Sequence, residues 1–255
     1  GVLVSSLVLF AGNAIAAPSY GEGGGTATGF ESVAIGTGAQ ATKIHTTAIG
    51  PGAKALDDDA TAIGKDAQAI GKYSTAIGDW AKANEKYSNA LGYEATAEAL
   101  RSTAIGMEAK VEGQDATDSF AIGNLTHVTG AFSIALGQEA KVTASYSSAV
   151  GYQSEANSSG STAIGPWAKT FGVDSAALGN HAEASGFKSL ALGNSTKAIG
   201  SESLALGLLA EASGSESLAL GRSAEASGSA SNAIGWKANA TAQNATALGS
   251  AAKAY

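Results

Sequence analysis

The sequence has no cysteine, only three prolines, and few aromatic or charged residues. The absence of cysteine excludes disulfides, thiolate metal sites and thiol nucleophiles. Aromatic residues make up 6% of the chain and charged residues 15%, and much of the apolar 44% is alanine. This composition cannot fill the thick core of an ordinary globular domain, but it can fill a thin one. The formal net charge of −7 argues against a nucleic-acid partner, because such a surface needs clustered lysine and arginine.

The first residues differ in composition from the rest of the chain. An apolar run from Val2 to Phe10 is followed by small residues with an Ala14-x-Ala16 pattern. This order is typical of a secretory signal peptide, so we interpret residues 1–17 as its C-terminal part, with cleavage after Ala16 or Ala17. The run is too short to span a bilayer as a helix. A buried strand or helix is the alternative interpretation.

The rest of the chain repeats one short motif. The triplet Ala-[Ile/Leu/Val]-Gly occurs in sixteen copies, which end at Gly36, Gly50, Gly64, Gly78, Gly92, Gly106, Gly123, Gly137, Gly151, Gly165, Gly179, Gly193, Gly207, Gly221, Gly235 and Gly249. Every step is 14 residues except the step of 17 between Gly106 and Gly123. We therefore interpret residues 18–255 as one array of about 16 coils, with a three-residue insertion in the coil between these two glycines.

In each coil, small residues occupy every second position around the repeat glycine. The residue two before the glycine is always alanine, and the residue four before it is serine or threonine in 14 copies. The residues three and five after it are mostly alanine. Alternation of this kind predicts strands rather than helices. Charged residues such as Lys54 and Glu183 stand between the later alanines and need water, so these alanines should point inward. Glycine at the strand ends permits tight corners with positive φ.

The period of 14 residues predicts the architecture. It suffices for two short strands and two corners, but not for a βαβ unit, which takes about 30 residues. The sequence therefore predicts an all-β solenoid of two-stranded coils, a parallel β-roll. We expect the Ile/Leu/Val row in the roll interior, opposite the alanine rows, and the opposite assignment remains open. Burial within one roll falls short of the backbone entropy lost, so we also expect side-by-side association of rolls.

With these motifs identified, the chain resembles a known family. Residues Ser32 to Gly36, Ser203 to Gly207 and the pattern Ala224-x-Ala226-x-Gly228 are similar to the head repeats of YadA-like trimeric autotransporter adhesins. The resemblance covers about residues 27–254. It implies a left-handed parallel β-roll, a homotrimer with its chains side by side, and export by the type V route to the surface of a Gram-negative bacterium.

The same resemblance implies attachment to host extracellular matrix proteins such as collagen, to host cells or to other bacteria, through the outer surface of the trimer. No neck, stalk or anchor strands are recognisable in the sequence. We therefore expect this chain to be the N-terminal part of a longer protein, which contacts the outer membrane only through an anchor domain absent from this chain.

Aromatic residues occupy the two corners of the predicted coils. Those just after the repeat glycine are Trp80, Tyr93, Tyr152, Trp167 and Trp236, and those nine after it are Tyr73, Tyr87, Phe132 and Tyr146. Equivalent positions in successive coils should stack, which predicts the pairs Tyr73 with Tyr87 and Phe132 with Tyr146. These residues could form an exposed ridge that binds a protein ligand. They could instead serve ladder stacking or contacts between protomers.

Metal and catalytic sites are not indicated. The run Asp57 to Asp59 could hold Ca²⁺, but we favour a solvated loop, because the sequence has no Gly-Gly-x-Gly-x-Asp calcium repeat. His45, His127 and His181 occupy different positions in their coils and cannot form one row. No nucleophile has a base in register, so we expect no cofactor, no metal and no enzymatic activity.

Two alternatives to adhesion remain at this point. An ice-binding face needs a regular threonine array, and threonines three before the repeat glycine form an interrupted one: Thr47, Thr61, Thr75, Thr103, Thr162 and Thr246. A structural surface solenoid without a specific ligand is the other.

Overall fold

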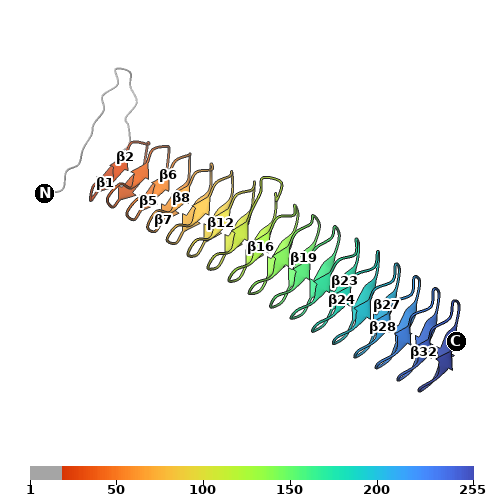
Figure 1. The fold of residues 1–255 in the computed structure, drawn as a ribbon. Coiled ribbons are helices and arrows are strands. Elements are labelled where there is room, and N and C mark those ends of the chain that lie inside the picture. The colour runs from red at the N-terminus through yellow and green to blue at the C-terminus, as the bar shows by residue number, and fades with distance from the viewer. Residues whose placement is uncertain (1–18) are drawn as a thin grey trace. The chain divides into compact units, whose positions relative to one another are not determined.

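The structure is a computed structural model that describes residues 19–255, in two compact units divided after Leu125. Both units are all-β, and the described residues contain 34 strands and no helix, so none of them forms a membrane-spanning helix. In each unit the strands alternate between two sheets (Figure 1). Odd-numbered strands of three residues form the odd sheet, and even-numbered strands of two residues form the even sheet. The signal-peptide interpretation of residues 1–17 lies outside the described residues.

The first unit contains β1 to β15. Its odd sheet consists of β1 (Tyr20–Glu22), β3 (Val33–Ile35), β5 (Thr47–Ile49), β7 (Thr61–Ile63), β9 (Thr75–Ile77), β11 (Asn89–Leu91), β13 (Thr103–Ile105) and β15 (Phe120–Ile122). Its even sheet consists of β2 (Thr26–Ala27), β4 (Gln40–Ala41), β6 (Lys54–Ala55), β8 (Gln68–Ala69), β10 (Lys82–Ala83), β12 (Thr96–Ala97) and β14 (Lys110–Val111).

The second unit contains β16 to β34. Its odd sheet consists of β17 (Ile134–Leu136), β19 (Ser148–Val150), β21 (Thr162–Ile164), β23 (Ala176–Leu178), β25 (Leu190–Leu192), β27 (Leu204–Leu206), β29 (Leu218–Leu220), β31 (Asn232–Ile234) and β33 (Thr246–Leu248). Its even sheet consists of β16 (His127–Val128), β18 (Lys141–Val142), β20 (Glu155–Ala156), β22 (Lys169–Thr170), β24 (Glu183–Ala184), β26 (Lys197–Ala198), β28 (Glu211–Ala212), β30 (Glu225–Ala226), β32 (Asn239–Ala240) and β34 (Lys253–Ala254).

Equivalent residues of successive coils pair in parallel. In the first unit Ala34 pairs with Ala48, and in the second unit Ala205 pairs with Ala219. One odd and one even strand make a coil, so both units are parallel β-solenoids, as the period predicts. The strands make 17 coils, one more than the glycine triplets, because β1 and β2 precede the first triplet.

The insertion changes a corner and leaves the strand register intact. Ala104 of β13 still pairs with Ala121 of β15, although 17 residues separate them. The extra residues form an additional turn between β14 and β15, in which the Ala116 N–H donates to the Gly113 carbonyl at 3.1 Å. A corner absorbs three residues easily because it lies outside the ladder.

The space between the sheets is filled by small side chains. The alanines two before the repeat glycine are 0–2% exposed, and those three and five after it are likewise buried, except Ala252 and Ala254 in the last coil. The predicted inward direction of these later alanines is therefore confirmed. The largest fully buried side chains are Val111, Val128 and Val142, each on the even sheet. The interior is a layer about as deep as two small side chains.

The prediction that the Ile/Leu/Val row lines this interior is wrong. Ile77, Leu136 and Leu192 are 38%, 44% and 41% exposed and lie on the outer face of the odd sheet. Side chains alternate along a strand, so the residue next to a buried alanine must point outward. The interior has no room for a longer row.

The backbone conformation at one corner of the coil explains why the repeat contains a glycine there. Its φ lies between 118° and 138° in the sixteen triplets, a region that residues with a Cβ rarely adopt. A Cβ at Gly92 would also lie 2.3 Å from the carbonyl oxygen of Gly106 in the next coil. The prediction of positive-φ corners is confirmed here. At the other corner of the coil, nine residues after the repeat glycine, the residue with positive φ is usually not glycine. Tyr146, for example, has a φ of 60°.

Candidate functional site

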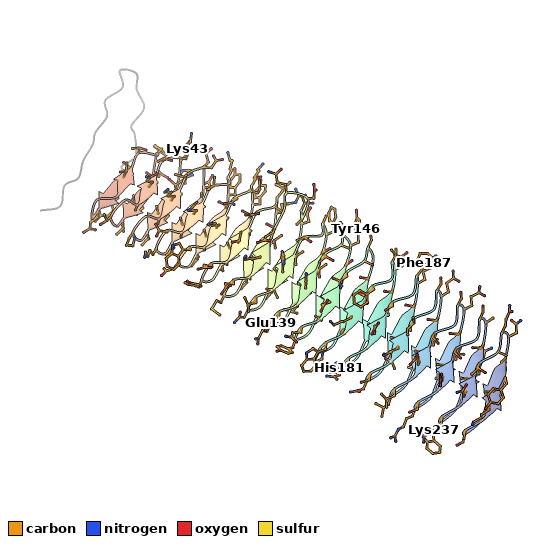
Figure 2. The ribbon with its side chains drawn as sticks, in the orientation of Figure 1. Lys43, Glu139, Tyr146, His181, Phe187 and Lys237 are labelled. Atoms are coloured by element: carbon orange, nitrogen blue, oxygen red, sulfur yellow. The ribbon has the colours of Figure 1, made fainter. Side chains whose placement is uncertain are left out.

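The exposed aromatic residues lie at the two corners of the coils. The glycine corner comprises the residues one and two after the repeat glycine, and the far corner comprises those eight and nine after it. Figure 2 shows Glu139, His181 and Lys237 at the glycine corner of the second unit, with Tyr146 and Phe187 at the opposite edge. Because each corner repeats every coil, its side chains form rows.

In the first unit the structure brings four predicted residues together in two pairs. Tyr73 and Tyr87 stack at the far corner with 5.1 Å between ring centroids and 6° between planes, which confirms the predicted ladder. Trp80 and Tyr93 meet edge to face at the glycine corner, 5.5 Å apart. Lysine ammonium groups lie over three of these rings at 4.8 to 5.2 Å, namely Lys65 over Trp80, Lys72 over Tyr73 and Lys86 over Tyr87. These contacts use part of each ring surface.

In the second unit Phe132 and Tyr146 stack at 5.3 Å and 8°, which confirms the second predicted ladder. Tyr152 and Trp167 meet edge to face at 5.2 Å. Trp236 is 51% exposed, and Lys237 lies over its ring. The nine predicted aromatic residues therefore form separate pairs and one exposed tryptophan, rather than one continuous ridge in either unit.

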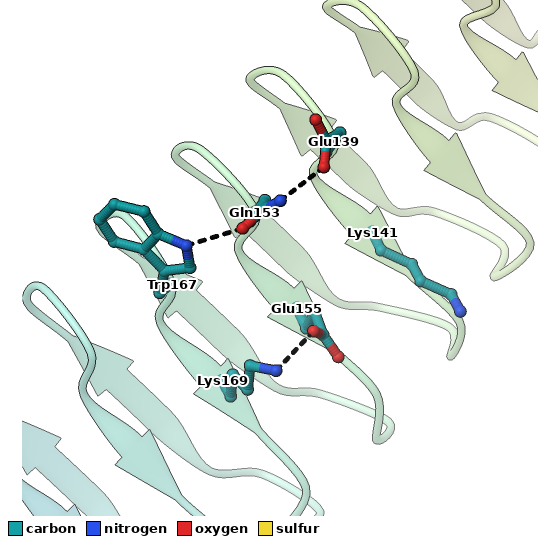
Figure 3. Close-up of a pocket in the computed structure, with 6 residues that line it drawn as sticks. All are labelled: Glu139, Lys141, Gln153, Glu155, Trp167 and Lys169. Atoms are coloured by element: carbon teal, nitrogen blue, oxygen red, sulfur yellow. Dashed lines mark hydrogen bonds and ion pairs between the residues drawn. The ribbon is translucent and has the colours of Figure 1, made fainter.

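A groove in the second unit contains one of these aromatic residues. It has a volume of about 280 Å³ and is lined by Glu139, Lys141, Gln153, Glu155, Trp167 and Lys169 (Figure 3). Three of these residues stand at the glycine corner, two after the repeat glycine, and three stand on β18, β20 and β22 of the even sheet. The groove thus runs across three successive coils.

Hydrogen bonds hold the side chains of the groove in place. The Trp167 Nε1–H donates to Gln153 Oε1 at 2.7 Å, and Gln153 Nε2 donates to Glu139 Oε2 at 2.6 Å. On the even sheet Lys169 Nζ lies 2.7 Å from Glu155 Oε1. Burial alone would raise the pKa of Glu155, but hydrogen bonds from Lys169 and Asn157 outweigh it and hold this pKa below its usual value. The carboxylate is therefore ionised at neutral pH.

Among the groove residues only Trp167 was a candidate from the sequence. The other five are common polar residues, and the type of each residue alone does not indicate a binding site. The available signal was their position, since they occupy two fixed places of the repeat in three consecutive coils.

Histidine and aspartate side chains meet in the first unit without forming a metal site. His45 lies between two carboxylates of neighbouring coils, with Nδ1 3.0 Å from Asp59 Oδ1 and Nε2 3.3 Å from Glu31 Oε2. This contact was not predicted from the sequence, although His45 and Asp59 stand nine residues after their repeat glycines in successive coils. Asp58 pairs instead with Lys72 at 3.1 Å, so the three aspartates do not converge. Within residues 19–255 no cluster of His, Asp or Glu could hold a metal ion.

The outer face of the odd sheet is largely apolar in both units. It carries the aliphatic row, such as Ile105 in the first unit and Ile164 in the second, at 38% and 40% exposed. In the second unit β25, β27 and β29 each present two leucines to this face. The even sheet instead presents charged residues such as Lys169 and Glu183. A large exposed apolar surface rimmed by polar residues marks an interaction site.

The threonine row of the ice-binding alternative lies on this same face. Thr47, Thr61 and Thr75 pair with one another in register, and Asn89 follows them. The aliphatic row runs beside them on the odd sheet. The face therefore combines a short threonine row with a continuous apolar one.

Comparisons with known proteins identify the repeat. A family model described as the YadA head domain repeat (2 copies) matches the chain in successive segments from residue 27 to residue 252: 27–50, 41–67, 69–88, 86–109, 115–140, 129–154, 143–166, 156–182, 184–210, 212–238 and 231–252. No curated protein matches the chain in a direct sequence search.

Proposed function

The chain belongs to the YadA head family, and we propose from this that it is the head of a trimeric adhesin on the surface of a Gram-negative bacterium. Family membership supports an adhesin-like function, and heads of this family are not enzymes. The proposal includes a left-handed roll, export through a signal peptide by the type V route, and display at the outer membrane.

The observation that best supports a trimer is the apolar outer face of the odd sheet. One roll buries only small side chains, because its interior admits nothing larger than valine or threonine. Leu204 and Leu206 of β27 point away from this interior and would be buried by a second copy. Association of three odd sheets about a common axis covers all three apolar faces and leaves the charged even sheets in water.

The mass of the particle in solution tests this assembly. We expect residues 18–255 to sediment with three times the chain mass. Leu204→Asp places a carboxylate in the apolar face and should produce monomers. Ser213→Asp, which adds the same charge to the outer side of the same coil after β28, should leave the mass unchanged. A monomeric wild-type chain would refute the trimer.

The adhesive role extends to ligands outside the cell. We propose host extracellular matrix proteins such as collagen, host cells or other bacteria as partners, met by the corners and even sheets of the trimer. The aromatic pairs at the corners are the candidate contacts. Many weak contacts become strong attachment when three chains and many copies act together.

A solid-phase assay with collagens, fibronectin, laminin and mucin tests the ligand class. Binding should weaken when Tyr73 and Tyr87 are both replaced by serine, or when Phe132 and Tyr146 are. If the wild-type trimer binds none of these proteins and no cells, the remaining interpretation is a structural surface solenoid.

A further inference from the structure

The groove of the second unit has a floor made of backbone. In the chain, Ala140, Ser154 and Ala168 each stand between the two lining residues of their coil, and each is 0% exposed because its side chain points into the roll. The walls are the six side chains shown in Figure 3. A volume of about 280 Å³ lies just below the range of typical small-molecule sites, about 300–1,000 Å³. The groove therefore suits one ring of a longer chain better than a whole large ligand.

The floor excludes binding of a peptide by strand addition. The Lys141, Glu155 and Lys169 N–H groups donate to carbonyls of the following coil at 2.8 to 2.9 Å. Strand addition depends on free main-chain donors and acceptors at a sheet edge. Recognition here must come from side chains alone.

The side chains offer donors and acceptors in a mixed array. Glu139 and Glu155 accept, the two lysines donate, and the Gln153 amide does both. A hydroxyl group is donor and acceptor at once, so a ring bearing several hydroxyls can satisfy such an array in many ways. Two carboxylates and two ammonium groups also balance in charge, which gives no preference to a polyanion or a polycation.

The indole adds a rigid apolar surface. His181 stacks on Trp167 with 4.8 Å between centroids and 6° between planes, and Tyr152 meets it edge to face. With the hydrogen bond to Gln153, three contacts fix the ring, yet it remains 37% exposed. The negative face of an aromatic ring attracts polarised C–H groups such as those of a sugar ring. A side chain that is already fixed loses little entropy on binding.

We propose that this groove binds one ring of a neutral saccharide, with its C–H face against Trp167 and its hydroxyls on Gln153, Glu139 and Glu155. The groove lies on the even sheet and glycine corner, so it stays open when odd sheets associate. This inference rests on the proposed adhesin function, because a weak site gains affinity when three copies act on one glycan surface.

Spectroscopy of the tryptophans tests the site directly. The chain has three tryptophans, so a nitrogen–proton correlation spectrum of residues 18–255 contains three indole signals. Titration with chitotriose, N-acetyllactosamine and maltotriose should shift the Trp167 signal with at least one of them, with a dissociation constant of about 1 mM. The Trp80 and Trp236 signals should not move, since these residues lie outside the groove.

Variants provide the matched control. Gln153→Ala should weaken binding about tenfold or more. Glu183→Gln, a change on β24 outside the groove, should leave it unaltered. Each variant must keep the wild-type β-sheet circular dichroism and melting temperature.

The proposal is overturned if none of the three saccharides moves the Trp167 signal, or if Gln153→Ala binds as the wild type does. It is also overturned if a collagen-like Gly-Pro-Pro peptide moves that signal and the saccharides do not. A trimer without saccharide binding refutes the groove alone, whereas a monomer refutes the proposed function.

Discussion

Arg101 forms a two-pronged ion pair with Asp118, donating from Nε and Nη2 to the two carboxylate oxygens at 2.5 and 2.6 Å. The residues are 17 positions apart and occupy equivalent places on either side of the insertion. The pair therefore ties the enlarged corner to the preceding coil.

This pair makes stability depend on pH in acid. The hydrogen bond from Arg101 holds the pKa of Asp118 below its usual value. A depressed carboxyl pKa stabilises the fold above the unfolded value, about 3.9, and that contribution is lost as the pH falls through the folded value. Asp118→Asn should flatten the fall in melting temperature below about pH 4. If the melting temperature of this variant falls in acid as steeply as that of the wild type, the ion pair contributes nothing to stability. Many surface ion pairs make no measurable contribution.

The depth of the interior predicts which alanines resist enlargement. Ala149 on β19 is 0% exposed and its neighbours in the ladder are also alanine. Ala149→Leu should lower the free energy of unfolding by about 1–3 kcal/mol, because the sheets cannot separate without breaking contacts. Val150→Leu, on the outer face of the same strand, should change it by less than about 1 kcal/mol. Denaturant titration of both variants measures the difference, and equal effects would contradict the thin interior.

The corner conformation predicts a stabilising substitution. Ala230 has a φ of 54° at the far corner, a conformation that costs a residue with a Cβ about 1–2 kcal/mol. Ala230→Gly should therefore raise the unfolding free energy by about 1 kcal/mol. Ala233→Gly, three residues later within β31, should lower it by about 0.5–1 kcal/mol. Thermal melts of the two variants should move in opposite directions; a shift of both downward would refute the strain.

Buried serines differ in what they contribute to the free energy of unfolding. Ser175 Oγ donates to the Gly172 carbonyl at 2.6 Å. Ser203 is equally buried, but its Oγ has no hydrogen-bond partner among the groups of residues 19–255. Ser175→Ala should cost about 1 kcal/mol of unfolding free energy. Ser203→Ala should be neutral or stabilising, because it removes a buried hydroxyl that gains nothing. A loss at Ser203 equal to that at Ser175 would contradict the assignment.

The fold follows closely from the sequence because each coil obeys local rules. The recurrence of alanine and glycine predicts strands, corners and the parallel pairing of equivalent residues. The same reasoning predicts that Tyr73 stacks on Tyr87, since neighbouring coils place equivalent residues one strand spacing apart. The candidate site could be predicted from the sequence less fully than the fold. The repeat positions of Gln153 and Lys169 place them near Trp167, but their hydrogen bonds and the groove they line depend on side-chain conformations that the spacing does not specify.

The repeat alone specified strand type, coil length and the coil that carries the insertion, because these depend on backbone preferences within a few residues. It did not specify the side of the sheet taken by the aliphatic row. That choice follows from the distance between the two sheets, a property of the folded coil. Two facing rows of alanine bring the sheets so close that Leu204 and Leu206 can only point outward, and they create the apolar face on which we propose that sister chains meet.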